Sequence, residues 1–270
     1  MERDRPPDAL PSARNARSRA FTVLTFLFGA AALGGLFGIG IVIGWYDTDE
    51  GGIHRVHDLG FGVLYGIVVA TAFFVMVRRP GTKPSVFLQV VAVALAVAIA
   101  SLVSADPSYL SIAGALLAAS AILLALHPER DQVLHPRPKL SRVMSVFTLV
   151  AAIPLVSFAM TTARMQRIGS PLDPHVRMSH WTTMASMALG LVAVGLLASA
   201  RIRGWRVTAW CAGLGAAAYG LASIVFHRFS GTQVPYAGSE GIGWGLVAVI
   251  GGLMFIAIAE WEARRSRSAT

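Results

Sequence analysis

The residues best suited to chemistry lie in one short stretch that leads into a long apolar run. Residues 173–181 read DPHVRMSHW, so two histidines, an acid and a tryptophan stand close together. Asp173 and Pro174 predict a helix start, because the carboxylate can cap the first turn and proline fits there. On one continuous helix the rings of His175 and His180 would point about 140° apart. The stretch indicates a site, but these two imidazoles alone do not form a metal-binding pair.

More histidines and acids stand at the ends of other apolar segments, all expected on the same side of a membrane. We predict a candidate ligand or metal cluster in the second half of the chain, made of His180, His227, Glu240, His175 and Asp173. A secondary cluster in the first half consists of His54, His57 and Asp58. Its two histidines are three residues apart and share a helical face if the helix begins early enough.

Three interpretations of these polar groups are open. Neutral imidazoles and carboxylates can bind Zn²⁺ or a similar divalent ion. The same groups can activate water in an interfacial hydrolase that acts on a lipid-linked substrate. They can also be packing or solvated groups beside interfacial tryptophans, in a structural or assembly protein without chemistry. No spacing among them is diagnostic of one of these roles.

Methionines beside His180 add a copper alternative. Met184 and Met187 follow His180 at i+4 and i+7, and Met178 precedes it. Thioethers suit Cu(I), whereas methionine in a membrane helix is more often a packing residue. We expect packing roles for these side chains, with copper as the alternative.

The elements that must position these groups are membrane helices. The chain has 270 residues, of which 55 % are hydrophobic and 14 % charged, unlike a soluble globular protein. Eight apolar runs are long enough, or nearly so, to span a bilayer as helices. They lie at 21–45, 59–77, 86–104, 109–126, 143–163, 182–200, 207–226 and 242–259. We predict an all-α integral membrane protein surrounded by the lipid bilayer.

The distribution of basic residues predicts the orientation. With the N-terminus inside, 18 of the 23 Lys and Arg residues fall in cytoplasmic segments and five in outer loops. This positive-inside bias places both termini in the cytoplasm, across a plasma membrane of bacterial type. Because the bases are spread over several short segments, the net charge of +9 reports topology, and we expect no nucleic-acid partner.

The chain also repeats its own pattern. His57 and His180 each open a helix, Arg78 and Arg201 each follow one, and both pairs are 123 residues apart. We predict two four-helix halves in the same orientation, related by an axis along the membrane normal. The predicted units are a disordered basic tail at 1–20, a first half at 21–126, a cytoplasmic linker at 127–142, a second half at 143–262 and a tail at 263–270.

Short motifs resemble an uncharacterised bacterial multi-pass membrane family. The matching features are the Trp45-Tyr46-Asp47 segment, the histidines that open the next helix, and Glu240-Gly241 before the last one. The resemblance implies a multi-pass membrane fold and no particular activity. Haem A synthase, another eight-helix family with two halves, is rejected because helices four and eight offer no outer histidine. We expect a membrane protein whose outward-facing cluster binds a metal ion or a polar ligand.

Overall fold

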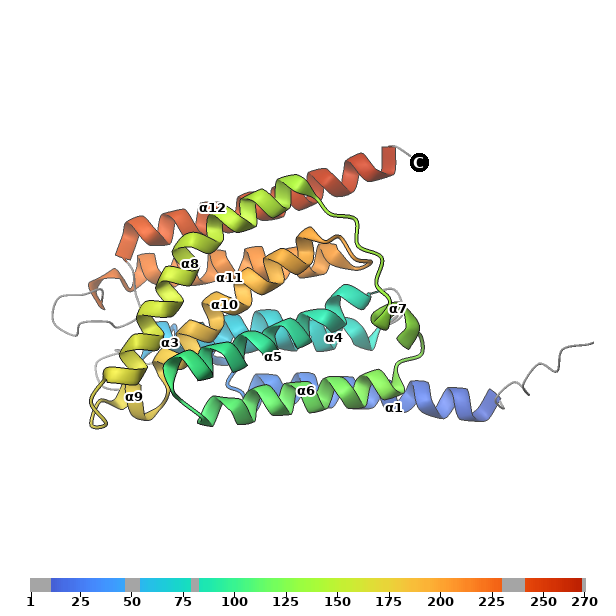
Figure 1. Ribbon diagram of the computed structural model, residues 1–270, viewed down its shortest axis with the longest axis horizontal. Coiled ribbons are helices and arrows are strands. Elements are labelled where there is room, and N and C mark those ends of the chain that lie inside the picture. Colours follow the sequence, from blue (N-terminus) through green and yellow to red (C-terminus); the bar gives the residue numbers. More distant parts are fainter. Residues whose placement is uncertain (1–10, 47–53, 79–82, 230–240, 269–270) are drawn as a thin grey trace, which may run out of the picture.

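The computed structural model describes residues 11–46, 54–78, 83–229 and 241–268, and every regular element in these ranges is a helix (Figure 1). The elements are α1 (Pro11–Gly34), α2 (Gly40–Ile43), α3 (Arg55–Phe61), η2 (Gly62–Ala70), α4 (Thr71–Val77), α5 (Pro84–Ser104), α6 (Ser108–Leu126), α7 (Arg130–Leu134), α8 (Arg142–Ile168), α9 (Pro174–Arg177), α10 (His180–Ser199), α11 (Trp205–Val225), η4 (His227–Phe229) and α12 (Gly241–Ser268).

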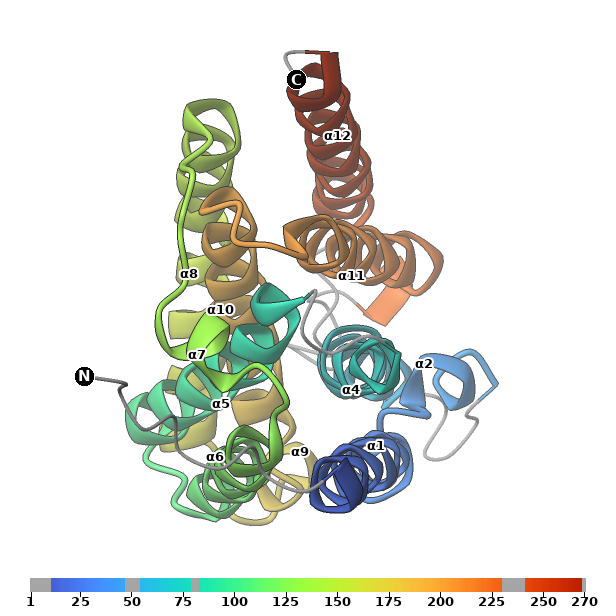
Figure 2. The ribbon, with the colours of Figure 1, turned by 90° about the vertical axis from the view of Figure 1, so that its right-hand side faces the viewer.

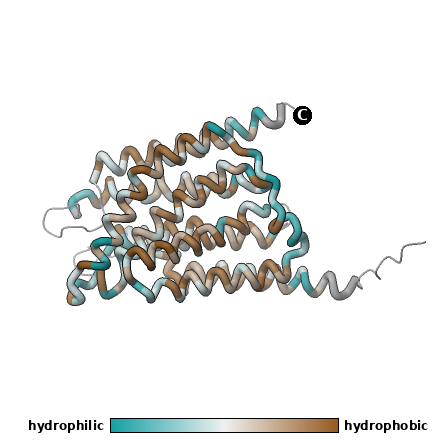
Figure 3. The backbone as a smooth tube through the Cα atoms, in the orientation of Figure 1, coloured by the Kyte–Doolittle hydropathy of each residue, from teal (hydrophilic) through white to brown (hydrophobic). Residues whose placement is uncertain are grey.

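Among the described residues, seven helical stretches are long and apolar enough to cross a membrane. They are Arg55–Val77, which joins α3, η2 and α4, then α5, α6, α8, α10, α11 and residues Gly241–Arg265 of α12. Figure 3 shows apolar residues along the middle of the bundle and polar residues toward its two ends. Helix length and composition thus support the predicted all-α, multi-pass membrane protein.

The first apolar segment differs from the expected single helix over 21–45. α1 ends at Gly34, the backbone turns through Phe37 at φ 57°, and the short α2 begins at Gly40. The turn permits a close approach, because a β-carbon on Gly40 would lie 2.3 Å from the carbonyl oxygen of Asp58. The 24-residue α1 and the four-residue α2 stand here in place of one helix over 21–45, and glycine is the residue that allows the close packing.

Two segments expected to lie outside the helices are partly helical. α1 begins at Pro11, so residues 11–20 form its first turns rather than the expected tail. Arg17 holds these turns against the end of α6 by donating from Nη2 to the carbonyl oxygen of Ala125 at 2.5 Å. That carbonyl belongs to the last turn of α6 and has no partner within its own helix. The expected linker at 127–142 contains α7.

The central helix of the bundle is α10. Of its membrane-spanning window 72 % is buried, against 22 % for α8 and 28 % each for α6 and α12. α10 contacts α5, α8 and α11, and it also contacts the continuous helix of α3 and η2. Figure 2 looks along the bundle and shows α8 and α12 on its outside. The candidate site is therefore built at the start of the helix with the least lipid contact.

A π-helix interrupts the second long helix. η2 covers Gly62–Ala70 between α3 and α4, and the backbone N–H of Thr71 donates to Gly66 five residues back. Gln89 of α5 adds a bond from outside this helix, because its Nε2 donates to the carbonyl oxygen of Val68 at 2.8 Å. Such π-turns are rare and concentrate near functional sites. This one begins five residues after His57.

Candidate metal centre

Four buried histidines come together at one end of the bundle. His54, His57, His175 and His180 each offer one ring nitrogen, and these nitrogens lie within 4.8 Å of one another. The four residues are 8 %, 0 %, 3 % and 6 % exposed, respectively. They belong to the end of the bundle at which α3 and α9 lie, opposite the end at which α12 finishes (Figure 1). Closely grouped neutral imidazoles are ligands for borderline ions such as Zn²⁺, Ni²⁺ and Cu²⁺.

The first pair of histidines comes from the start of α3. His54 directly precedes the helix and His57 is its third residue, so the two rings lie on one face. Both rings contact His175, with centroid distances of 4.9 Å from His54 and 4.7 Å from His57. The tight packing of α2 at Gly40 supports α3 from another side. The first half of the chain thereby presents two imidazoles to the second half.

The second pair depends on a break between α9 and α10. As expected, Asp173 caps α9 by accepting from the backbone N–H of His175, and Pro174 occupies the first turn. The helix does not continue to His180, however, because Ser179 adopts a left-handed conformation at φ 55° and α10 begins anew. The separation of about 140° required one continuous helix. With the break, the rings of His175 and His180 lie 5.7 Å apart between centroids.

Asp173 also orients the ring of His175. Its carboxylate oxygen lies 3.0 Å from Nδ1 of that ring. A carboxylate accepts at this oxygen, so Nδ1 is the donor, and in the neutral ring Nε2 holds a lone pair. Nε2 is buried and has no hydrogen-bond partner among the described residues. A carboxylate on one imidazole nitrogen and a free lone pair on the other is the usual arrangement of a metal-ligating histidine.

His54 and His180 link the two pairs of histidines, because their Nδ1 atoms are only 3.3 Å apart. The rings of His57 and His180 are stacked at 5.0 Å. Aromatic side chains enclose the group, with Trp181 4.9 Å from the ring of His57 and Phe61 5.9 Å from that of His180. Exclusion of water by these walls strengthens any interaction between an ion and the four rings.

A polar network from the first half holds the start of α10. Asp106, in the turn between α5 and α6, accepts from Thr182 at 2.8 Å and from the hydroxyl of Ser108. Burial raises the pKa of Asp106, but hydrogen bonds from Ser108, Ser179 and Thr182 outweigh burial and leave that pKa below its ordinary value. The ionised carboxylate lies at the N-terminus of α10, where negative charge is favoured. It therefore fixes the residues on both sides of His180.

The methionines occupy different environments. Met184 and Met187 are fully buried below His180, whereas Met178 is 50 % exposed. A β-carbon on Gly60 would lie 2.5 Å from the sulfur of Met184 and 3.8 Å from that of Met187. Both thioethers thus fill the space beside α3, as packing residues do.

The remaining predicted residues lie apart from the four rings or outside the described ranges. His227 begins η4, is partly buried, and has its Nδ1 2.9 Å from the carbonyl oxygen of Ile224. It does not belong to the group of four, and Asp58 follows His57 on α3 without joining it. Glu240 lies outside the described residues. The two histidine clusters were assigned from the sequence to separate halves, although the 123-residue offset between His57 and His180 could have suggested that they meet near the axis of the predicted repeat.

No protein-family model matches this chain, and neither the curated proteins nor the solved structures contain a match to it. The arrangement itself defines the class of site: a compact, buried set of nitrogen ligands inside one end of a helical membrane protein. Such a set can bind a metal ion.

Proposed function

We propose that this protein is a multi-pass membrane metal-binding protein whose four-histidine centre holds Zn²⁺ or another borderline divalent ion. The observation that carries the proposal is the geometry of four buried imidazoles with ring nitrogens within 4.8 Å of one another. Packing alone does not account for it. An unsatisfied buried acceptor such as Nε2 of His175 costs about 1–3 kcal/mol, and a metal ion would remove that cost.

One pair of ring nitrogens has the spacing that a tetrahedral ion requires. Zinc–nitrogen bonds of about 2.0–2.1 Å at tetrahedral angles place ligand nitrogens roughly 3.3 Å apart. The Nδ1 atoms of His54 and His180 already have a separation of 3.3 Å. Four ligands close the coordination sphere, which is typical of sites that bind an ion for stability or storage. A hydrolase would keep one position open for water, so we favour a binding role over the catalytic alternative.

The proposal includes the finer architecture predicted from the sequence. We infer two four-helix halves. In the first half, α1 and α2 together form one membrane segment, which brings the total from seven to eight. Two contacts support the repeat: His57 stacks on His180 at 5.0 Å, and Ser85 hydrogen-bonds Thr208 at 2.9 Å. Both pairs are 123 residues apart, and equivalent residues meet where they lie close to a symmetry axis. The ion would then join the halves at that axis.

We further infer that both termini are cytoplasmic and the histidines external, in a plasma membrane of bacterial type. α1 begins and α12 ends at the end of the bundle opposite the histidines (Figure 1). That end carries Arg201 and Arg206, paired with Glu262 and Glu260. A basic end is expected on the cytoplasmic side.

Metal analysis of the full chain tests the proposal. The chain is purified in detergent without chelators, loaded with Zn²⁺, desalted, and its metal content and thermal unfolding are measured. We expect stoichiometric zinc after desalting. With free Zn²⁺ restored at 100 times its Kd we also expect a raised melting temperature, because the ion then adds about 2.7 kcal/mol to the free energy of unfolding. His57→Ala and His175→Ala should lose both effects. His135→Ala, at an exposed histidine of the opposite end, is the matched control and should retain them.

His227 was predicted from the sequence to belong to the second-half cluster, but it is not one of the four histidines. The variant His227→Ala should therefore bind zinc as the unaltered chain does. A folded protein that takes up no zinc, nickel or copper and melts at an unchanged temperature would refute the metal centre. Equal zinc loss in all four variants would refute the assignment to these histidines.

A further inference from the structure

An apolar groove lies far from the histidines, between the two outermost helices of the second half. Its volume is about 270 Å³, and its walls come from α8, α10, α11 and α12. On α12 the lining extends from Trp244 to Phe255, and on α10 it begins at Leu191, eleven residues beyond His180. The groove is therefore separate from the proposed metal centre.

The groove exists because α8 and α12 each lean on a different inner helix. α12 packs on α11 at glycines: a β-carbon on Gly252 would lie 2.3 Å from the carbonyl oxygen of Gly213. α8 packs on α10, where a β-carbon on Gly195 would meet the side chain of Thr148 at 2.9 Å. The two outer helices contact each other much less, and Figure 2 shows them apart at one end. The space left between them opens sideways from the bundle.

The surface around this opening is the surface that faces lipid. The membrane-spanning windows of α8 and α12 are only 22 % and 28 % buried. Large exposed apolar side chains flank the groove on both helices: Val146, Leu149, Ile153, Leu246, Ile250 and Leu253. The groove thus continues the lipid interface inward, and the lining is apolar except for Thr148 and the indole nitrogen of Trp244. Thr148 is already paired with the carbonyl oxygen of Met144 at 2.9 Å.

The length and the polar end of the groove match one lipid chain. Trp244 and Phe255 are eleven residues apart in the chain, which corresponds to about 16 Å of helix, or roughly one leaflet of a 30 Å hydrocarbon core. Trp244 lies near the start of α12, toward the histidine end, and its buried Nε1 has no hydrogen-bond partner among the described residues. The ester carbonyl of a phospholipid sits at the same depth as an interfacial indole and accepts hydrogen bonds.

We propose that this groove binds one acyl chain of a phospholipid from the leaflet on the histidine side. The chain fills the space between α8 and α12, and a lipid ester oxygen accepts from Nε1 of Trp244.

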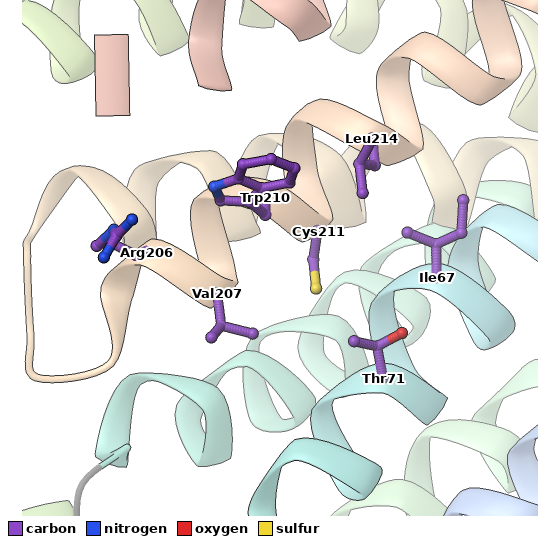
Figure 4. Close-up of a pocket in the computed structure, with 7 residues that line it drawn as sticks. All are labelled: Ile67, Thr71, Arg206, Val207, Trp210, Cys211 and Leu214. Carbon is purple, nitrogen blue, oxygen red and sulfur yellow. The ribbon is translucent and has the colours of Figure 1, made fainter. Parts of the chain in front are cut away.

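A second cavity, of about 310 Å³, lies between α11 and the continuous helix formed by η2 and α4 (Figure 4). There the guanidinium of Arg206 is engaged by Glu260 at 3.1 Å, so it does not offer a free cation to a lipid headgroup.

Two glycines of α12 provide a matched test. A β-carbon at Gly251, which lines the groove, or at Gly243, which does not, would meet no atom within 4 Å. Gly251→Leu should therefore fill the groove, and Gly243→Leu should leave it open, with little effect of either on folding. The full chain and both variants are delipidated in detergent, titrated with dioleoylphosphatidylglycerol, and followed by native mass spectrometry. Lipids that co-purify before delipidation are extracted and identified.

We expect one tightly retained phospholipid on the unaltered chain and on Gly243→Leu, and its loss from Gly251→Leu. Trp244→Phe should weaken retention about five-fold, as expected for one hydrogen bond. Ala151→Leu, which narrows the groove from α8, replaces Gly251→Leu if that variant does not fold. No retained phospholipid on the unaltered chain, or equal retention by all variants, would overturn the proposal. A co-purified prenyl lipid in place of phospholipid would overturn the choice of occupant.

Discussion

Asp173 offers the most direct test of how the proposed centre is built. Its carboxylate contacts the ring of His175 at 3.0 Å and caps α9 by accepting from the backbone N–H of the same residue at 2.9 Å. Asparagine keeps a capping oxygen but removes the charge. Hydrogen bonds to charged groups contribute about 1.5–3 kcal/mol and neutral ones about 0.5–1.5. Because the Asp173 side chain is 37 % exposed, we take the low end of that difference, about 1 kcal/mol.

Asp173→Asn should therefore weaken zinc binding about five-fold. Asp173→Ala removes the ring contact altogether and should weaken it about 10–100-fold, as expected for loss of a group that orients a metal-ligating histidine. The assay is competition against a chromophoric zinc chelator, with the purified chain in detergent at constant pH. Circular dichroism of the metal-free variants checks that the cap loss in Asp173→Ala has not unfolded the protein. Unchanged zinc affinity in a folded Asp173→Ala variant would refute the reasoning.

Three further predictions concern stability and topology. Asp106 has a folded-state pKa below its ordinary value, so its ionised form stabilises the fold above about pH 4 and that stability is lost as the pH falls further. Asp106→Asn should lower the melting temperature at pH 7 and reduce the fall in melting temperature between pH 7 and pH 3. If the melting temperatures of the two proteins fall in parallel over this range, the prediction is contradicted. Gly40→Ala should cost about 1–3 kcal/mol because its β-carbon would lie 2.3 Å from a backbone oxygen, whereas Gly243→Ala should stay within about 0.5 kcal/mol; equal thermal shifts would show the close packing to be unimportant. Reporter fusions after residues 79, 142 and 201 should read cytoplasmic and those within 164–174 external, and one clear inversion would refute the topology.

The membrane helices were largely predictable from the sequence. The seven spans in the described ranges begin within four residues of the expected positions, because a helix in lipid must satisfy its own backbone and needs about 20 apolar residues. The cap at Asp173 was equally local, since it depends on that carboxylate and the next few residues. These features are determined by neighbours in the chain, and no knowledge of the fold is needed to predict them.

The candidate site was decided by tertiary structure. The sequence indicates histidines at helix starts, but the meeting of His54 and His57 with His175 and His180 depends on α3 packing beside α10 across more than a hundred residues. The left-handed turn at Ser179, next to the buried Asp106 network, breaks the helix between His175 and His180. Their rings therefore come together instead of pointing apart. Similarly, the break after Gly34 and the π-turns of η2 accompany contacts between helices. Apolar periodicity specifies that a helix forms, whereas these features depend on which faces pack together, and the packing alone brings four separate imidazoles within reach of one ion.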